Sequence, residues 1–184
     1  MVTTATGLQL TERNLVLTGY IEPNKPRLGR QVAQQLRMPF VDVAELIEQR
    51  MGESVDVIRE QYGERRLKTV ETEIMEEVML HRNAVIRVSG STLVHSEHYE
   101  RLQQTSVIMC LVARLDAILQ RMHIALGARY HNPYERGAQL GSLRREWTVR
   151  SKTSLHELDF TYHDEAAMVT DIIALWQQVA IERL

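Results

Sequence analysis

The sequence predicts an α/β protein in which a parallel β-sheet is covered by helices on both faces. Short runs of strand-forming residues alternate along the chain with longer segments whose apolar residues recur at helical spacing, and this alternation is typical of such three-layer folds. The most apolar run, Ser106–Val112, is seven residues long, as expected of a strand that is buried on both faces. The length of 184 residues, without a repeat or a linker-like tract, predicts one domain over residues 1–184.

Composition narrows the class of protein. Lys and Arg number 22 and Asp and Glu number 24, which gives a net charge of −2 and argues against binding to nucleic acid. The single cysteine, Cys110, excludes an intramolecular disulfide and a cysteine-based zinc cluster. No apolar run reaches the roughly 18 residues of a membrane span, and the first residues do not resemble a secretion signal. We therefore expect a cytoplasmic protein that binds neither nucleic acid nor a membrane; composition leaves its oligomeric state open.

The expected elements follow one another in order. Strands are expected at residues 14–18, 40–43, 84–88 and 106–112, with a weaker one at 160–162. Helices are expected at residues 28–36, 45–51, 55–61, about 67–79, 115–122 and about 165–181. Residues 123–142 have no clear periodicity and are expected to form either a lid-like insertion or a long surface loop. In a parallel sheet, ligands bind beyond the carboxyl ends of the strands, so binding or catalytic residues are expected in the segments that follow the strands.

The segment Gly19–Pro26 joins the first expected strand to the first helix. A phosphate-binding loop, G-x-x-x-x-G-K-[ST], occupies this position in many proteins, and its backbone N–H groups hold phosphate. Gly19 and Lys25 match this pattern, whereas Asn24 stands at the second glycine and Pro26 at the hydroxyl residue. By itself, this partial match identifies a phosphate site only weakly.

The flanking sequence resembles the shikimate kinase family. Residues 13–19 (RNLVLTG) are similar to that family's first strand and the start of its loop, and residues 28–36 to its first helix. Residues 40–48 (FVDVAELIE) resemble the family pattern F-x-D-x-D-x-x-I-E, and residues 63–71 (GERRLKTVE) resemble G-E-x-x-F-R-x-x-E. The resemblance implies a P-loop kinase-like α/β/α fold whose five parallel strands are in the order 2-3-1-4-5.

The resemblance also implies candidate site residues and a small set of departures. It assigns Gly19, Lys25 and Arg129 to a nucleotide phosphate site, Asp42 to the metal side of that site, and Lys68, Gly90 and Arg150 to a substrate pocket. Departures from the family pattern occur at Glu22, Pro23, Asn24, Pro26, Ala44 and Lys68. Both prolines lack an N–H that could bind phosphate, and Pro26 also lacks the hydroxyl that would bind Mg²⁺. Ala44 replaces the family carboxylate that holds the substrate hydroxyl.

These departures lead to the hypothesis that the protein is a pseudokinase. It would have no functional catalytic residue, no cofactor and no metal site, and would act as a regulatory, ligand-binding or scaffold module whose partner is a small anionic metabolite or a protein. The alternative is an active kinase that uses ATP and Mg²⁺ and acts on shikimate or a related alcohol through a remodelled phosphate-binding loop. The two hypotheses differ in one observable, the consumption of ATP.

Overall fold

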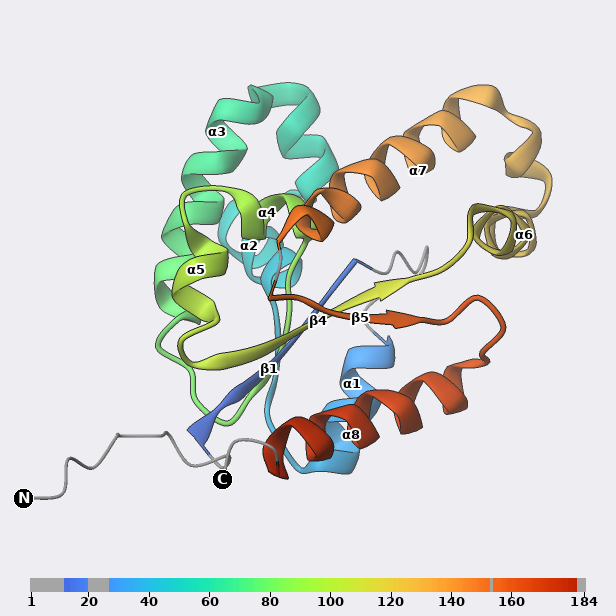
Figure 1. The fold of residues 1–184 in the computed structure, drawn as a ribbon. Coiled ribbons are helices and arrows are strands. Elements are labelled where there is room, and N and C mark those ends of the chain that lie inside the picture. The colour runs from blue at the N-terminus through green and yellow to red at the C-terminus, as the bar shows by residue number, and fades with distance from the viewer. Residues whose placement is uncertain (1–11, 20–26, 153, 182–184) are drawn as a thin grey trace, which may run out of the picture.

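The computed structural model describes residues 12–19, 27–152 and 154–181 and has three layers (Figure 1). Five parallel strands form one sheet in the order β2-β3-β1-β4-β5, so the expected parallel sheet and its strand order are confirmed. The strands are β1 (Asn14–Thr18), β2 (Phe40–Asp42), β3 (Val85–Arg87), β4 (Ser106–Val112) and β5 (His156–Asp159).

Helices fill both outer layers and the segments between strands. The α-helices are α1 (Arg27–Leu36), α2 (Val43–Met51), α3 (Val55–Val78), α4 (Gly90–Val94), α5 (His98–Leu102), α6 (Leu115–Leu126), α7 (Pro133–Glu146) and α8 (Glu165–Ile181). Two 3₁₀ helices, η2 (Gly127–His131) and η3 (Trp147–Ser151), flank α7. None of these helices, within the described ranges, has the length and apolar character needed to span a membrane.

The sheet is buried on both faces because its side chains alternate between two apolar clusters. Val16 of β1 and Ile108 of β4 belong to the cluster formed with α2, α3, α4 and α5, whereas Leu15 and Leu17 of β1 belong to the cluster formed with α1 and α8. Figure 1 shows these two groups of helices on opposite sides of the sheet. Successive side chains of a strand point to opposite faces, so every residue of β1 and β4 is buried and most of them are apolar.

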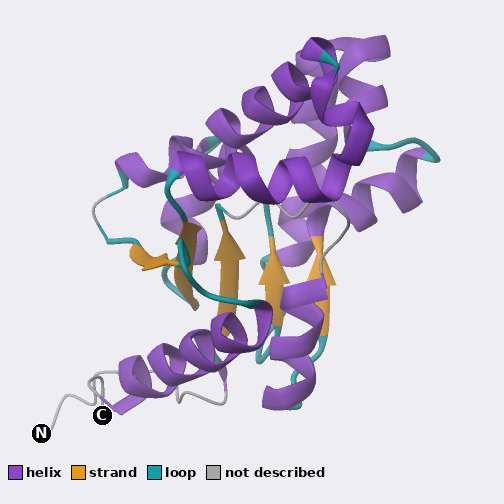
Figure 2. Ribbon diagram, turned by 90° about the vertical axis from the view of Figure 1, so that its right-hand side faces the viewer, coloured by secondary structure: helices purple, strands orange, loops and turns teal. Residues whose placement is uncertain are grey.

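All five strands point toward the same edge of the sheet, and helices lie across that end (Figure 2). The segments that follow β1, β2 and β3 therefore meet there, as expected for the binding edge of a parallel sheet. The last turn of α7 reaches this edge as well, since Glu146 lies beside Gly90 at the start of α4.

Three expected elements differ from the structure. The fifth strand is His156–Asp159 and not residues 160–162, because at the sheet edge its side chains alternate between partly buried and exposed positions and its sequence lacks a continuous apolar run. The helices expected at 55–61 and from about 67 form one element, α3, that is interrupted at Gly63, where φ is 80° and ψ is 163°. Residues 123–142 are largely helical, but α7 buries only Leu143, so no apolar face marks this helix in the sequence.

Candidate active site

A pocket of about 280 Å³ opens at the carboxyl ends of β1, β2 and β3. Thr18 ends β1 and Gly19 follows it, Asp42 ends β2, and Ser89 comes two residues after β3. The helical segments around the sheet edge supply the other polar side chains of its lining, which are Asp56, Arg59, Glu71, Ser91, Thr92, Gln139, Ser142, Arg145 and Glu146. The pocket therefore combines backbone groups of the sheet edge with charged side chains from α3 and α7.

Asp42 is held by the fold itself. Its Oδ1 accepts hydrogen bonds from the backbone N–H groups of Ala44 (2.9 Å) and Glu45 (3.3 Å), which makes it the N-cap of α2. Its Oδ2 lies 2.9 Å from Nη1 of Arg87 on the neighbouring strand β3. Because the Asp42 side chain is almost fully buried, this ion pair compensates a charge that has lost its water. Asp42 thus joins α2 to the sheet beneath the pocket.

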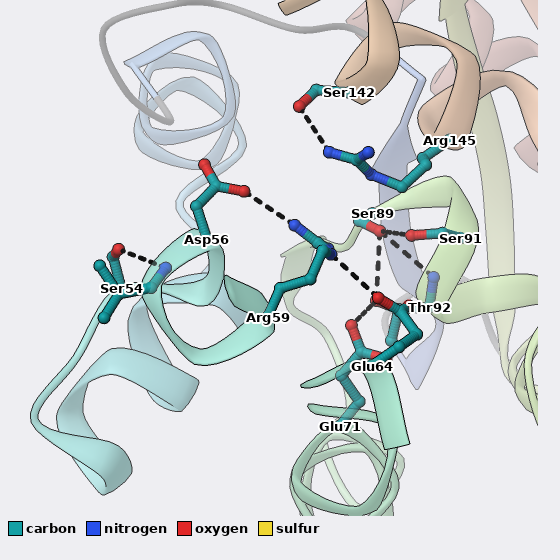
Figure 3. A network of polar contacts seen from close by, with 11 residues as sticks. Ser54, Asp56, Arg59, Glu64, Glu71, Ser89, Ser91, Thr92, Ser142 and Arg145 are labelled. Carbon is teal, nitrogen blue, oxygen red and sulfur yellow. Dashed lines mark hydrogen bonds and ion pairs between the residues drawn. The ribbon is translucent and has the colours of Figure 1, made fainter. Parts of the chain in front are cut away.

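Polar contacts link the wall formed by α3 to the segment after β3 (Figure 3). Arg59 binds Asp56 (Nη1 to Oδ1, 2.8 Å) and Glu64 (Nε to Oε2, 3.1 Å). Below them, the Thr92 hydroxyl donates a hydrogen bond of 2.8 Å to Glu71. Across the pocket, Arg145 donates to the Ser142 hydroxyl at 2.8 Å. Arg59 thus has two carboxylate partners, whereas Arg145 makes no ion pair with any described residue.

Glu71 should make stability depend on pH. Burial raises the pKa of its carboxyl group above the usual value of 4.5, although the hydrogen bond from Thr92 opposes this shift. Above pH 4.5, the folded protein therefore keeps a proton that the unfolded chain has released, and the free energy of unfolding decreases as the pH rises toward the folded-state pKa. We expect Glu71→Gln to reduce this decrease, measured as melting temperature from about pH 4 to pH 8. An equal decrease in the variant and the wild type would contradict the assignment.

Glu146 points into the pocket from the end of α7. Its Oε2 accepts a hydrogen bond of 2.8 Å from the backbone N–H of Gly90. Burial raises the pKa of the Glu146 carboxyl group, while the backbone N–H groups of Gly90 and Gly19 and the Arg87 guanidinium favour the charged form. The carboxyl group therefore lies between the end of β1 and the start of α4.

Cys110 lies next to this site but should be unreactive. Its side chain is fully buried in β4, and burial raises the pKa of the thiol to about 12. Since the thiolate is the reactive form, we expect no modification by iodoacetamide at neutral pH in the folded protein and complete modification after unfolding in urea, measured by mass spectrometry. Rapid labelling of the folded protein would show that β4 opens.

The structure brings some of the sequence-derived candidates together and separates others. Gly19, Asp42 and Gly90 lie at the pocket edge, and Lys25 lies outside the described residues, as do Glu22, Pro23, Asn24 and Pro26. Lys68 is absent from the pocket lining and borders a separate shallow hollow beside His95. Lys68 on α3 therefore lies beside that hollow, and its assignment to the substrate pocket stays a prediction.

The two expected arginines also lie away from the pocket. Arg150 is in η3, and its guanidinium binds both carboxylate oxygens of Glu157 on β5, at 2.8 and 3.0 Å. Arg129 is exposed in η2 and lies 3.6 Å from Glu135. In this structure Arg150 pairs with β5 and lies outside the pocket lining, and its assignment to the substrate pocket stays a prediction.

Sequence reasoning missed Arg59, Glu71, Arg145 and Glu146 as pocket residues. The adjacent charges at positions 145 and 146 were the available signal. Their inward orientation depends on how α7 packs over α4, and no local pattern encodes that contact. His95 and His98 are three residues apart, but His98 is buried and its Nδ1 bonds the Thr92 carbonyl. The described ranges contain no cluster of three or more His, Cys, Asp or Glu side chains that could hold a metal ion.

A parallel sheet in this order, with a polar pocket where β1 and β3 end, defines a P-loop kinase-like fold. A family model described as "Shikimate kinase" matches residues 24–176, which is most of the chain. The protein belongs to the shikimate kinase family.

Individual relatives agree with this assignment. The chain is 31% identical to a shikimate kinase of Thermodesulfovibrio yellowstonii over 131 residues, which are 70% of this chain and 76% of that protein. It is 32% identical to a shikimate kinase of Geobacter sulfurreducens over 110 residues, or 60% of this chain and 61% of the relative. The alignment thus spans less than two thirds of the second protein.

Solved structures share the fold. Shikimate kinase from Acinetobacter baumannii, in complex with shikimate, has a TM-score of 0.71 at 21% identity, with 91% of this chain and 94% of that chain covered. Shikimate kinase from Bacteroides thetaiotaomicron has a TM-score of 0.70 at 20% identity, with coverage of 91% and 98%. A gluconokinase from Sinorhizobium meliloti has a TM-score of 0.64 at 13% identity, with coverage of 95% and 97%. At these identities, the likeness supports the architecture alone.

The expectation of a pseudokinase is wrong. The similar proteins of Thermodesulfovibrio yellowstonii and of Caldicellulosiruptor bescii, each 31% identical to this chain, are both named shikimate kinase, and they point to an enzyme. Nothing in the comparisons supports a regulatory or scaffold module. The departures at the phosphate-binding loop do not overturn this conclusion, because substitutions at individual positions can be accommodated by other groups of a site.

Proposed function

We propose that the protein is an ATP-dependent kinase that transfers a phosphoryl group to a hydroxyl of shikimate or a related small alcohol. Membership in the shikimate kinase family, together with a polar pocket at the carboxyl ends of β1 and β3, carries this proposal. Phosphoryl transfer needs little covalent chemistry from a protein, since its rate depends on positioning and on charge stabilisation. The pocket has groups for both tasks.

The acceptor side of the pocket suits a small polyol that carries an anionic group. Serine and threonine hydroxyls line it, namely Ser89, Ser91, Thr92 and Ser142. Arg145 is the cation of the lining that has no carboxylate partner among the described residues. A guanidinium binds a carboxylate through two parallel hydrogen bonds. Arg145 would therefore bind the carboxylate of a substrate such as shikimate. The hydroxyls would then bind the ring hydroxyls.

The phosphate side begins at the end of β1. The Thr18 hydroxyl is buried in the lining, and the described residues provide no hydrogen-bond partner for it. Gly19 has φ of 86°, and a Cβ at this position would lie 2.4 Å from Sγ of Cys110, so only glycine fits. Lys25, in the segment that follows, would add the positive charge that nucleotide phosphates require. These groups would receive the phosphates of ATP.

The described residues do not form a resident magnesium site. Mg²⁺ prefers oxygen ligands such as carboxylates, but both oxygens of Asp42 are occupied by backbone N–H groups and Arg87. Mg²⁺ is therefore expected to arrive with ATP, bound by the phosphates and water. In this account, Asp42 positions the pocket and is not itself a metal ligand.

The proposal is tested by measuring ADP formation with ATP, Mg²⁺ and a panel of small alcohols that includes shikimate and gluconate. We expect turnover that needs both Mg²⁺ and an acceptor and that falls by at least about 100-fold in Lys25→Ala, because this variant loses a charge that stabilises the transferred group. Lys152→Ala is the matched control, since Lys152 binds Glu100 and does not line the pocket. Absence of turnover with every acceptor would overturn the proposal.

A further inference from the structure

We propose that Glu146 is the catalytic base that accepts the proton of the acceptor hydroxyl, in the role that Ala44 cannot perform. This inference rests on the proposed kinase function. Both residues line the same pocket, but Glu146 comes from the end of α7 and Ala44 from the start of α2. The carboxylate would therefore have moved from one wall of the pocket to another.

Among the acidic side chains that line the pocket, the other three are engaged. Asp42 binds Arg87 and caps α2. Asp56 is paired with Arg59. Glu71 accepts a hydrogen bond from the Thr92 hydroxyl. Glu146 has neither a salt bridge nor a side-chain donor among the described residues, and its carboxylate is approached by the backbone N–H groups of Gly90 and Gly19.

The backbone fixes the position of Glu146. A Cβ at Gly90 would lie 1.7 Å from the Glu146 carbonyl oxygen, so the end of α7 and the start of α4 are in direct contact. The Gly90 N–H then holds Oε2 at 2.8 Å, and the Gly19 N–H interacts with the same carboxyl group. The carboxylate therefore lies beside the end of β1, and in the proposed function an acceptor hydroxyl bound there would be close to the transferred phosphate.

The surroundings of the Glu146 carboxylate raise its pKa above the usual value of 4.5. Arg87 of β3 and Arg145 of α7 favour its charged form, whereas burial favours the neutral form and dominates. The Cys110 thiol of β4 also faces it and is neutral. In the other elements packed against it, α4 has no titratable side chain, and Arg150 of η3 is paired with Glu157. A base is most effective when its pKa lies close to the working pH.

The chemical step balances without another reactant. The acceptor O–H bond breaks as its proton moves to a carboxylate oxygen of Glu146, and the acceptor oxygen forms a bond to the γ-phosphorus of ATP. The bond between that phosphorus and the β,γ-bridging oxygen breaks, and ADP leaves with the electron pair. The products are the phosphorylated alcohol, ADP and protonated Glu146, which then releases its proton to water.

The test is a pH profile of kcat for the wild type, Glu146→Gln and Glu146→Asp with MgATP and the accepted alcohol. Removal of a general base lowers rates by roughly 100- to 10,000-fold, so we expect a loss of this size in Glu146→Gln. We expect kcat of the wild type to decrease at acidic pH, and we expect the Glu146→Gln profile to lack this decrease. Glu146→Asp, which keeps a carboxylate, should retain that decrease with a smaller loss of kcat.

Controls separate this inference from the proposed function. Glu76→Gln should leave kcat and its pH profile unchanged, because Glu76 binds Arg101 on the outer side of α3 and lies outside the pocket lining. Melting temperatures would show that each variant is folded. If the wild type is active and Glu146→Gln has an unchanged kcat and pH profile, the role of Glu146 is overturned and the proposed function is not. The same holds if Glu146→Asp has lost the decrease of kcat at acidic pH. A wild type inactive with every acceptor overturns both the inference and the proposed function.

Discussion

Replacing Gly90 with alanine should destabilise the protein by about 3 kcal/mol, at the upper end of the cost of overpacking. The new Cβ would lie 1.7 Å from the carbonyl oxygen of Glu146 and 2.7 Å from its carbonyl carbon. Both are backbone atoms, so a side-chain rotation cannot relieve the contact, and α7 must move away from α4. For a chain of this length the melting temperature should fall by about 6–12 °C, as measured by circular dichroism.

Gly137→Ala is the matched control for Gly90→Ala. Gly137 is also a helical glycine, in α7, but a Cβ there meets no atom within 4 Å. This substitution should stabilise the protein by about 0.5–1 kcal/mol, because alanine loses less conformational freedom in a helix. Equal melting temperatures for Gly90→Ala and the wild type would show that the α7–α4 contact is not as close as the structure has it.

Replacing Asp42 with alanine should cost about 3 kcal/mol of stability, near the lower end for a broken buried ion pair because Arg87 keeps some access to water. The substitution leaves the Arg87 guanidinium without its partner and removes the N-cap of α2, which alone contributes about 1 kcal/mol. The free energy of unfolding would be measured by urea denaturation monitored by fluorescence.

A double variant isolates the ion pair from the cap. Asp42→Ala combined with Arg87→Met should be more stable than Asp42→Ala alone, because the unpaired charge is gone while the volume beside β2 is retained. Ser54→Ala, which removes the N-cap of α3 without touching an ion pair, gives the size of a cap effect for comparison. If the double variant is no more stable than Asp42→Ala, the pair contributes nothing beyond capping.

The central strands could be predicted because a strand that is buried on both faces has a nearly continuous apolar sequence. In β1 and β4 every residue is buried, and their apolar runs define the centre of the sheet. The fifth strand was misplaced because an edge strand needs only one buried face, and His156–Asp159 alternates accordingly. Helix α7 buries only Leu143, so its sequence shows no apolar face at helical spacing.

The site could be predicted only where it depends on the sheet. Gly19, Asp42 and Gly90 meet because the carboxyl ends of β1, β2 and β3 share one edge. The contribution of α7 depends on a tertiary contact between Gly90 and Glu146, which no sequence spacing determines. Arg150 was assigned from the resemblance to the family, and only packing shows that Arg145 lines the pocket whereas Arg150 is bound to Glu157.

Observation of the phosphoryl group itself tests the kinase account most directly. Phosphorus NMR of the wild type with ATP, Mg²⁺ and shikimate would follow the γ-phosphate as it leaves ATP. The account predicts a new phosphomonoester resonance that grows with the ADP signals in equal amount. An unchanged ATP spectrum, or ADP accompanied only by inorganic phosphate, with shikimate and with every other alcohol of the panel, would contradict it.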